Sequence, residues 1–493
     1  MIGPWSPAAD LLDAQSAAVV SVTWAGRTWR LSSVALTGDA HIDPGLVEIP
    51  DLDDEISIES GGDVGATASI AVVLPCIAIA DYIAAGYDPT DITAEIAIVY
   101  HRGGVLLHGW AARDVRLSGW AIEPEWGDPT QPAGYLACTV EDSPYRTERP
   151  ICRWAWAVST ETWPTAPEFG ARYPLVIGAP DPDAVGEGPP APLLAATAGN
   201  ADLLLVSIGW CLATTVTIID DAGAVEVFTI EYREDGLGQV CAVVDVSAAG
   251  TISRTGSYTS AWTAGPALAP LGGVGPLHIA AYLLSIGGAD LDLPEWARLA
   301  RSLDLPMGGY VDDPETAAWE VARDLLTGLP VTMRRARDGW APVLTDPHLS
   351  AAVDSWPADG PWRRVSSWAS AGESRIVRAE VTSQTTELRA GEGPARNAAL
   401  PHAWARHYPG GNEAAVQSSW SWSAATDWRM LGWIARIGAM GWEAAAFQAP
   451  SQWARAQVGE WVDLPADGRA AMVQRRTLAD GLWDYTLIRP AGR

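Results

Sequence analysis

The stretch VGEWVDLPADGRAAMVQRRTLADGLWDYTLIRP, residues 458–490, decides how the end of the chain folds. Two turn signals with the same letters interrupt it, Ala466-Asp467-Gly468 and Ala479-Asp480-Gly481. Each turn separates runs of strand-forming residues. Because Asp-Gly supplies the positive φ that tight hairpins need, the spacing predicts a three-stranded meander.

The bulk composition places this meander in a large globular protein. The chain has 493 residues, of which 48% are hydrophobic, and this length suggests two to four domains with well-buried cores. It contains 48 Gly and 36 Pro, spread along the sequence. Such a spread favours many short elements joined by turns over long helices.

The charge balance is strongly acidic. Asp and Glu number 60 against 32 basic residues, all of them Arg, which leaves a net charge of −28. A surface that grips nucleic acid needs a basic footprint, so the composition argues against that function. It is compatible with a wall along which nucleic acid slides without sticking.

Cysteine usage and hydropathy indicate in which cellular compartment the protein is made. The five cysteines are odd in number and form no CxxC pair, so we expect buried free thiols rather than a disulfide framework or a zinc site. The first residues resemble no signal peptide, and no apolar run reaches the length of a membrane span. We therefore expect a soluble protein made in a reducing compartment, with no stable membrane insertion. The cysteines are Cys76, Cys138, Cys152, Cys211 and Cys241.

The strand, helix and turn signals predict a β-rich α+β fold: several small β-barrel-like domains with a short helical block. Four regions follow from them. Residues 1–163 form an N-terminal β-barrel-like domain, and residues 164–275 an inserted β-rich arm or loop domain. Residues 276–359 form a helical domain with a strand–turn–strand, and residues 360–493 a C-terminal β-domain with one helix and the meander.

Pro and Gly mark the ends of the helices predicted in the third region. Gly287-Gly288 stops the first helix, and Pro294 starts the second, where its missing N–H costs nothing. The third helix has Pro314 in its first turn and Gly328 near its C-cap. Further on, residues 387–413 are predicted to be an exposed loop.

Few residue patterns indicate chemistry. His41 and Asp43 are two possible metal ligands in one turn, which is weak evidence for a site. His402 and His407 are expected on a surface loop. Asp181-Pro182-Asp183 lacks the Gly and the bidentate Glu of a calcium-binding EF-hand. The HExxH, GxSxG and P-loop motifs are absent from the sequence.

Carboxylates are plentiful, and a glycosidase needs only two at the correct separation, which a sequence does not reveal. Two groups stand out, both favouring solvated strand ends over catalysis: Asp51, Asp53, Asp54 and Glu55 before one strand, and Glu231, Glu234 and Asp235 around a turn. We therefore assign no catalytic, cofactor-binding or metal residue and no cofactor, and we do not expect an enzyme.

Tryptophan is the largest anomaly, with 26 residues spread over all regions. Exposed Trp would stack on sugars, whereas buried Trp would fill cores and subunit interfaces. The spread favours the second reading. The clusters are Trp154-Ala155-Trp156, Trp420-Ser421-Trp422, and Trp428 with Trp433.

The order of these parts resembles the tail hub or baseplate hub proteins of tailed bacteriophages. In that family a helix feeds a strand–turn–strand, and a C-terminal barrel carries three strands with recurring positions. The resemblance covers about two thirds of the chain and leaves out 164–275. The matching residues are Gly339, Pro342, Val343 and Leu344, then Gly459, Val462 and Leu464, then Val473, Arg475, Tyr485 and Leu487.

The resemblance implies a structural virion protein, assembled in the bacterial host cytoplasm and located at the tail tip. Such a hub forms a ring that closes the tail tube and joins it to distal tail proteins and to fibre or spike proteins. Family members are usually trimers. Genomic DNA and the tape-measure protein would pass its lumen without specific binding, and the outer edge of the meander would pair with a neighbouring subunit.

Two other functions remain open. The Trp content is compatible with a host-recognition or glycan-binding tail component, whose binding surface we would seek in residues 164–275. Paired carboxylates are compatible with an enzyme that degrades cell-wall or capsule polysaccharides.

Overall fold

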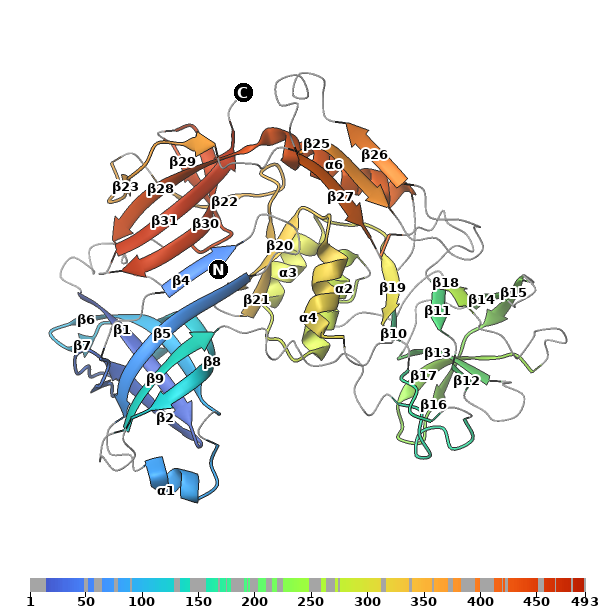
Figure 1. The fold of residues 1–493 in the computed structure, drawn as a ribbon, viewed down its shortest axis with the longest axis horizontal. Helices are drawn as coiled ribbons and strands as arrows, with labels where there is room; N and C mark the ends of the chain where they lie inside the picture. The colour runs from blue at the N-terminus through green and yellow to red at the C-terminus, as the bar shows by residue number, and fades with distance from the viewer. Residues whose placement is uncertain are drawn as a thin grey trace.

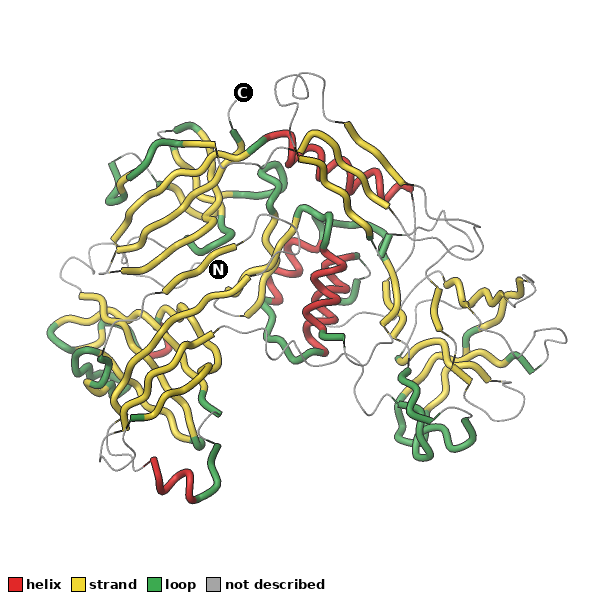
Figure 2. The backbone as a smooth tube through the Cα atoms, in the orientation of Figure 1, coloured by secondary structure: helices red, strands yellow, loops and turns green. Residues whose placement is uncertain are grey.

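The computed structural model shows a β-rich, multi-domain protein whose few helices lie mainly in a central block (Figures 1 and 2). This confirms the predicted fold class. The structure describes residues 15–47, 52–56, 64–74, 79–88, 91–127, 134–141, 157–166, 169–173, 175–178, 190–192, 194–195, 203–209, 215–219, 225–247, 259–262, 271–273, 275–311, 316–336, 339–356, 359–370, 376–382, 395–399, 412–418, 420–421, 424–450, 456–465, 467–479 and 482–491.

The N-terminal region is a closed barrel, drawn in blue at the lower left of Figure 1. Its strands run in the order β5-β9-β8-β6-β1-β2-β3, and hydrogen bonds from Val47 N to Ala71 O (2.9 Å) and from Val73 N to Gly45 O (2.7 Å) close the ring. The strands are β1 (Gln15–Trp24), β2 (Arg27–Ser32), β3 (Asp43–Pro44), β5 (Val64–Leu74), β6 (Thr93–Arg102), β7 (Val105–Leu106), β8 (Asp114–Trp126) and β9 (Gly134–Glu141).

Local signals set the turns of this barrel. Ala25 and Gly26 both have positive φ and join β1 to β2, as the sequence predicts. The short helix α1 (Ile79–Ala84) ends before Gly86, whose φ is 93°. The ring of Tyr82 on α1 lies 5.4 Å from that of buried Trp24, measured between ring centroids, so this helix packs against the barrel at that point.

The C-terminal meander forms as predicted. Strand β30 pairs antiparallel with both β29 and β31, and β31 pairs with β28 (orange to red in Figure 1). The strands of this barrel-like sheet are β22 (Ala352–Ser355), β23 (Arg363–Arg364), β24 (Ala369–Ser370), β28 (Trp442–Pro450), β29 (Trp461–Leu464), β30 (Arg469–Ala479) and β31 (Leu482–Pro490).

The edges of the meander are covered within the chain, so the predicted pairing of its outer edge with a neighbouring subunit is wrong. Strand β22 pairs parallel with β29 on one side. Strand β4 (Leu52–Ile56) pairs antiparallel with β30, with Glu55 opposite Arg475 and Leu52 opposite Leu478. The physical reason is that strands of the same chain, β22 beside β29 and β28 beside β31, already fill the backbone hydrogen-bonding sites of the two outer strands.

Strand β4 also pairs with β5, so it lies between the two barrels and belongs to both. A single 16-stranded sheet therefore runs from the N-terminal barrel into the C-terminal one. The sequence EISIESGGDVGATASIAVVLP, which starts at Glu55, predicts a strand pair with its turn at Gly61-Gly62. Strands β4 and β5 form a pair, but β4 already starts at Leu52, and the turn lies outside the described residues.

The helical block lies between the barrels and the rest of the molecule. Pro294 sits in the first turn of α3, as predicted, and the Asp292 side chain accepts a hydrogen bond from Glu295 N. Helix α4 begins only at Ala318, and Pro314 lies outside the described residues. The elements are α2 (Pro276–Ile286), α3 (Leu293–Ala300), α4 (Ala318–Leu326), β19 (Gly308–Val311), β20 (Val331–Ala336) and β21 (Gly339–Leu344).

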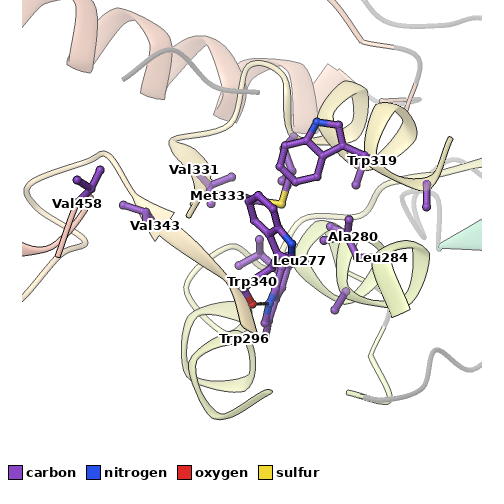
Figure 3. Packing of buried hydrophobic residues seen from close by; sticks show 14 of the residues in the cluster. Leu277, Ala280, Leu284, Trp296, Trp319, Val331, Met333, Trp340, Val343 and Val458 are labelled. Carbon is purple, nitrogen blue, oxygen red and sulfur yellow. Dashed lines mark hydrogen bonds between the residues drawn. The ribbon is translucent and has the colours of Figure 1, made fainter. Parts of the chain in front are cut away.

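Tryptophans fill the core of this block, where Trp296, Trp319 and Trp340 gather with Met333 between the helices and the β20–β21 hairpin (Figure 3). The Trp296 Nε1 group donates a 2.7 Å hydrogen bond to Trp340 O, which gives the buried indole its polar partner. Among the described residues, none of the helices combines the length and the apolarity needed to cross a membrane.

Residues 190–262 contribute two four-stranded sheets, at the right of Figure 1. Their facing sides share a separate core that includes Leu204, Val216 and Val244. The sequence AVEVFTIEYRE, residues 224–234, predicts one strand, but the strand breaks at buried Ile230, because its two halves join different sheets. The strands are β11 (Pro190–Pro192), β18 (Thr259–Trp262), β14 (Thr215–Ile219) and β15 (Val225–Thr229) in one sheet, and β12 (Leu194–Ala195), β13 (Leu203–Ile208), β17 (Val240–Asp245) and β16 (Glu231–Glu234) in the other.

This sandwich is attached to the helical block through a backbone pair. Strand β10 (Leu175–Gly178) pairs antiparallel with β19. Val176 on β10 belongs to the core of the sandwich, while its neighbours Leu175 and Ile177 belong to the main core. Alternate side chains of one strand therefore serve both cores.

A three-stranded sheet with one helix completes the fold. Helix α6 (Ala424–Met440) covers β25 (Ile376–Thr382), whose Ala379 and Val381 are buried as the alternating pattern predicts. The predicted loop 387–413 is wrong in part, because β26 (Ala395–Ala399) and the start of β27 (Asn412–Gln417) pair with β25. Ala-rich segments carry little intrinsic strand preference, so their pairing comes from the tertiary context.

We expect Asp54→Pro to uncouple the two barrels. Proline removes an N–H from a strand paired on both sides, and the carbonyl left unpaired costs roughly 1–3 kcal/mol of unfolding free energy. Asp54→Ala keeps the amide and is the matched control. Urea unfolding monitored by circular dichroism should show a clear loss of stability for the first variant alone, and equal losses for both would contradict the central position of β4.

Candidate functional site: the meander junction

The meander contacts three other parts of the chain around a set of residues that we call the meander junction. It comprises Arg334, Gln457, Glu460, Trp461, Arg476 and Trp483, together with the β4–β30 pair. The loop before β29 turns at Gly459, which has a φ of 82° and whose N–H donates to Val473 O at 2.7 Å. This turn presents the side chains on either side of it to the helical block.

The first contact is a buried ion pair with β20. The Arg334 guanidinium donates to Glu460 Oε1 at 3.0 Å and to Gln457 Oε1 at 2.8 Å. Glu460 Oε2 accepts the Gln457 backbone N–H at 2.8 Å, so both carboxylate oxygens are engaged. Because the Arg334 and Glu460 side chains are only 10% and 19% exposed, removing either partner would leave a charge uncompensated in a dry environment.

The second contact fixes the meander to β21. The buried Trp461 indole donates from Nε1 to Leu344 O at 3.1 Å. This bond connects the end of the strand–turn–strand to the first strand of the meander. Trp461 also lies 6.5 Å from Trp442 on β28, measured between ring centroids, and both rings belong to the main core.

The third contact crosses from one barrel to the other. Two guanidinium groups lie close to the centroid of the Trp483 ring on β31, that of Arg476 at 4.9 Å and that of Arg116 on β8 at 5.0 Å. Arg476 and Tyr485 both donate to Ala456 O, at 3.3 and 3.2 Å. A desolvated cation–π contact contributes about 2 kcal/mol, so this stack strengthens the β4–β30 joint.

The chemistry of the junction is that of a structural joint. Its carboxylate, amide and guanidinium groups bind one another within the chain. No group of three or more His, Cys, Asp or Glu side chains with metal-binding geometry occurs among the described residues. The sequence does not reveal this site, because Arg334 and Glu460 are 126 residues apart and no local pattern links them.

Of the histidines singled out from the sequence, the structure describes His41. His41 Nε2 and Asp43 Oδ1 are 2.8 Å apart on an exposed turn, and the pair acquires no third ligand in the described part of the chain. His402 and His407 lie outside the described residues, as does Asp181-Pro182-Asp183.

The two carboxylate groups have different surroundings. Asp53, Asp54 and Glu55 lie on β4, in the middle of the joint and not at a strand end, while Asp51 lies outside the described residues. The predicted position at the end of a strand is therefore wrong for the first three, because they lie within β4, whose backbone is paired on both sides.

Around the second group, Glu231 pairs with Arg233 at 3.0 Å on the surface. Asp235 is buried and accepts hydrogen bonds from Tyr173 Oη at 3.0 Å and from the backbone N–H groups of Leu237 and Gln239, both at 2.9 Å. Burial raises the pKa of the Tyr173 hydroxyl, which stays protonated and donates. Asp235 therefore organises the turn.

The described tryptophans of the predicted clusters differ in burial. Trp420 is buried and donates from Nε1 to Asp324 at 3.0 Å, and Trp433 is half-buried against the main core. Trp428 on α6 is 54% exposed. Trp154, Trp156 and Trp422 lie outside the described residues. Core filling is thus confirmed for Trp420 and for the tryptophans of the junction.

Two cysteines are described, and both are free and buried, as predicted. Burial raises the pKa of the Cys138 thiol to about 11 and that of Cys241 to about 12, so both stay protonated at neutral pH. Cys76, Cys152 and Cys211 lie outside the described residues.

The same substitution, Trp to Ala, at one buried and one exposed position distinguishes a residue of the meander junction from a surface residue. Trp483→Ala removes a side chain that is 1% exposed, and we expect it to lower the free energy of unfolding by about 3–5 kcal/mol. Trp428→Ala acts on the exposed ring and should change it by no more than about 0.5 kcal/mol. Urea unfolding of both variants measures the difference, and similar losses would show that Trp483 is not a core residue.

Solved structures that match nearly the whole chain include three described as tail proteins, two of them from prophages. A tail protein from Neisseria meningitidis shares 11% identity at a TM-score of 0.41, and the match covers 96% of both chains. A prophage tail protein from Shewanella oneidensis shares 8% identity at a TM-score of 0.39, covering 96% of this chain and 98% of that one.

A third similar structure, a prophage tail protein from Listeria monocytogenes, shares 7% identity at a TM-score of 0.36, covering 97% of this chain and 95% of that one. No family model matches the sequence, and no curated protein matches it.

Proposed function

We propose that this chain is a structural virion protein, a hub that forms a ring at the tip of a phage tail tube and joins the tube to distal tail or host-binding components. The observation that carries the proposal is the continuous sheet, in which β4 belongs to both barrels. A segment of a ring that bears load must hold its barrels at a fixed angle, and a shared backbone ladder does so.

The junction supports the same role. Arg334 and Glu460 tie the helical block to the meander, and Arg116 ties the N-terminal barrel to Trp483. The three parts therefore move together. The function is structural and uses no catalytic group, no metal and no cofactor. The four-part division at 163, 275 and 359 remains part of the proposal, with β4 as a strand that the first part shares with the last.

The ring itself is the next step of the proposal. Cyclic symmetry closes such assemblies, and a trimer is favoured. A net charge of −28 per chain would let genomic DNA and the tape-measure protein pass the lumen without specific binding. Its partners are the tail tube, distal tail proteins and fibre or spike proteins, and its place is the tail tip of the virion, after assembly in the bacterial host cytoplasm.

A second candidate function, host recognition, is favoured by the sandwich. This unit has its own core, and within the described residues its strand β15 pairs on one side only, with β14. Val227 on β15 is 67% exposed. An unpaired edge that carries an exposed apolar side chain is a ready site for another protein to add a strand.

Light scattering coupled to size exclusion tests the hub proposal. We expect a mass three times that of the chain, or a mass that rises toward it with concentration, and ring-shaped particles in electron micrographs. Because the ring segment depends on the joined barrels, Asp54→Pro should lower the trimer fraction, whereas Asp54→Ala should keep it. A strict monomer at every concentration would contradict the proposal.

A further inference from the structure

The outer wall of the N-terminal barrel holds a hollow of about 220 Å³. Strands β1, β2, β6 and β8 form its floor, and the short 3₁₀ helix Trp110–Ala112 and the following Arg113 form one side. The inward neighbours of the floor residues, such as Val20 and Val22, belong to the main core, so the hollow opens on the outside of the barrel.

The strand register gathers polar side chains on this floor. One row crosses four strands, because Ser21 lies opposite both Arg30 and Glu95, and Glu95 lies opposite Ser118. The next row repeats the pattern. Its lining residues are Thr28, Thr23 and Thr93.

The two arginines of the hollow differ in their partners. Arg113 binds Glu95 with both arms of its fork, from Nε to Oε1 at 2.6 Å and from Nη2 to Oε2 at 2.8 Å. The hydrogen bond to Glu95 raises the pKa of Arg113, and the two charges cancel. The Arg30 guanidinium lies 4.9 Å from the Trp110 ring, and its buried Nε has no hydrogen-bond partner within the described part of the chain.

A second polar group is also left unsatisfied. Ser21 is only 7% exposed, and its Oγ has no hydrogen-bond partner among the described residues. It faces the same hollow as Arg30 and lies directly opposite it in the strand pair. Buried polar groups normally find partners, so two unsatisfied donors that converge on a hollow indicate a ligand.

We propose that this hollow binds an acidic saccharide unit, with its carboxylate on Arg30 and Ser21. A guanidinium group matches the planar geometry of a carboxylate. The lining retains one positive charge in excess, which suits a single negative charge in a chain whose net charge is −28. Glu95 and the Thr and Ser hydroxyls of the floor can then bind the hydroxyl groups of the sugar.

This site goes beyond the proposed hub function and lies outside the sandwich. It gives the barrel wall a means of contacting acidic polysaccharides. The Trp110 ring already contacts two guanidinium groups, that of Arg30 and, at 4.7 Å, that of Arg113. The ligand is therefore recognised by charged and hydroxyl groups and not by stacking on this ring.

Titration calorimetry of the full chain with D-glucuronate, D-glucose and acetate tests the proposal. We expect D-glucuronate to bind, and D-glucose and acetate to bind at least about tenfold more weakly, since each lacks one half of the recognition. Arg30→Met should weaken D-glucuronate binding about tenfold or more, and Ser21→Ala about three- to tenfold.

Arg27→Met is the matched control, because Arg27 lies on the same strand but outside the hollow and stacks on Trp29. It should leave D-glucuronate affinity unchanged. Circular dichroism confirms that each variant folds, and the milder Ser21→Ala decides the matter if Arg30→Met does not. Absence of D-glucuronate binding, equal binding of D-glucose or acetate, or unchanged affinity in Ser21→Ala would each overturn the proposal.

Discussion

The backbone pairing of β4 with β30 is the interaction on which the rest of the structure depends. It joins residues more than four hundred positions apart, and closing so long a loop carries an entropic cost that grows slowly with length. That cost is offset by one main core, which includes Val22 in the first barrel and Leu487 in the last. Without β4, the free edge of β30 would be open to other chains.

Around this ladder, large side chains and their polar partners fix the remaining parts. Trp461 bonds to the end of β21, and the Arg334–Glu460 pair secures the same block by charge. The Trp483 ring contacts the guanidinium group of Arg116 from the N-terminal barrel and that of Arg476 from the meander. Tryptophan suits these positions because it buries a large area. The Trp461 N–H also fixes the orientation of its ring, whereas the buried Trp483 Nε1 has no hydrogen-bond partner among the described residues. The high Trp content of the chain thus has a mechanical explanation at the junction. The sandwich keeps a core between its two sheets, while other side chains of β13 and β17, such as Leu205 and Val243, belong to the main core.

Much of the local structure could be predicted because its signals are local. Asp-Gly turns predict the meander, Pro294 the start of α3, and the alternation around Val381 the strand β25. The pairing partners of the strands could not be predicted. An alternating pattern shows which side chains of a strand share a face, but it does not show which strand lies beside it. The same limit explains why β26 reads as a loop and why Arg334 and Glu460 show no relation in the sequence. The hollow around Ser21 and Arg30 also arises from the register of four strands, and each of its residues looks ordinary alone.

Hydrogen exchange of the β4 amides tests the central claim most directly. A strand that is paired on both sides should open only when the barrels separate, so the amides of residues 53–55 should exchange as slowly as those in the core strands β1 and β31. The edge strand β15 supplies the fast reference within the same molecule. Slow exchange in β4 is the result that the continuous sheet predicts. Exchange in β4 as fast as in β15 would mean that the barrels are joined by a loose contact, and the rigid segment proposed for the ring would be lost.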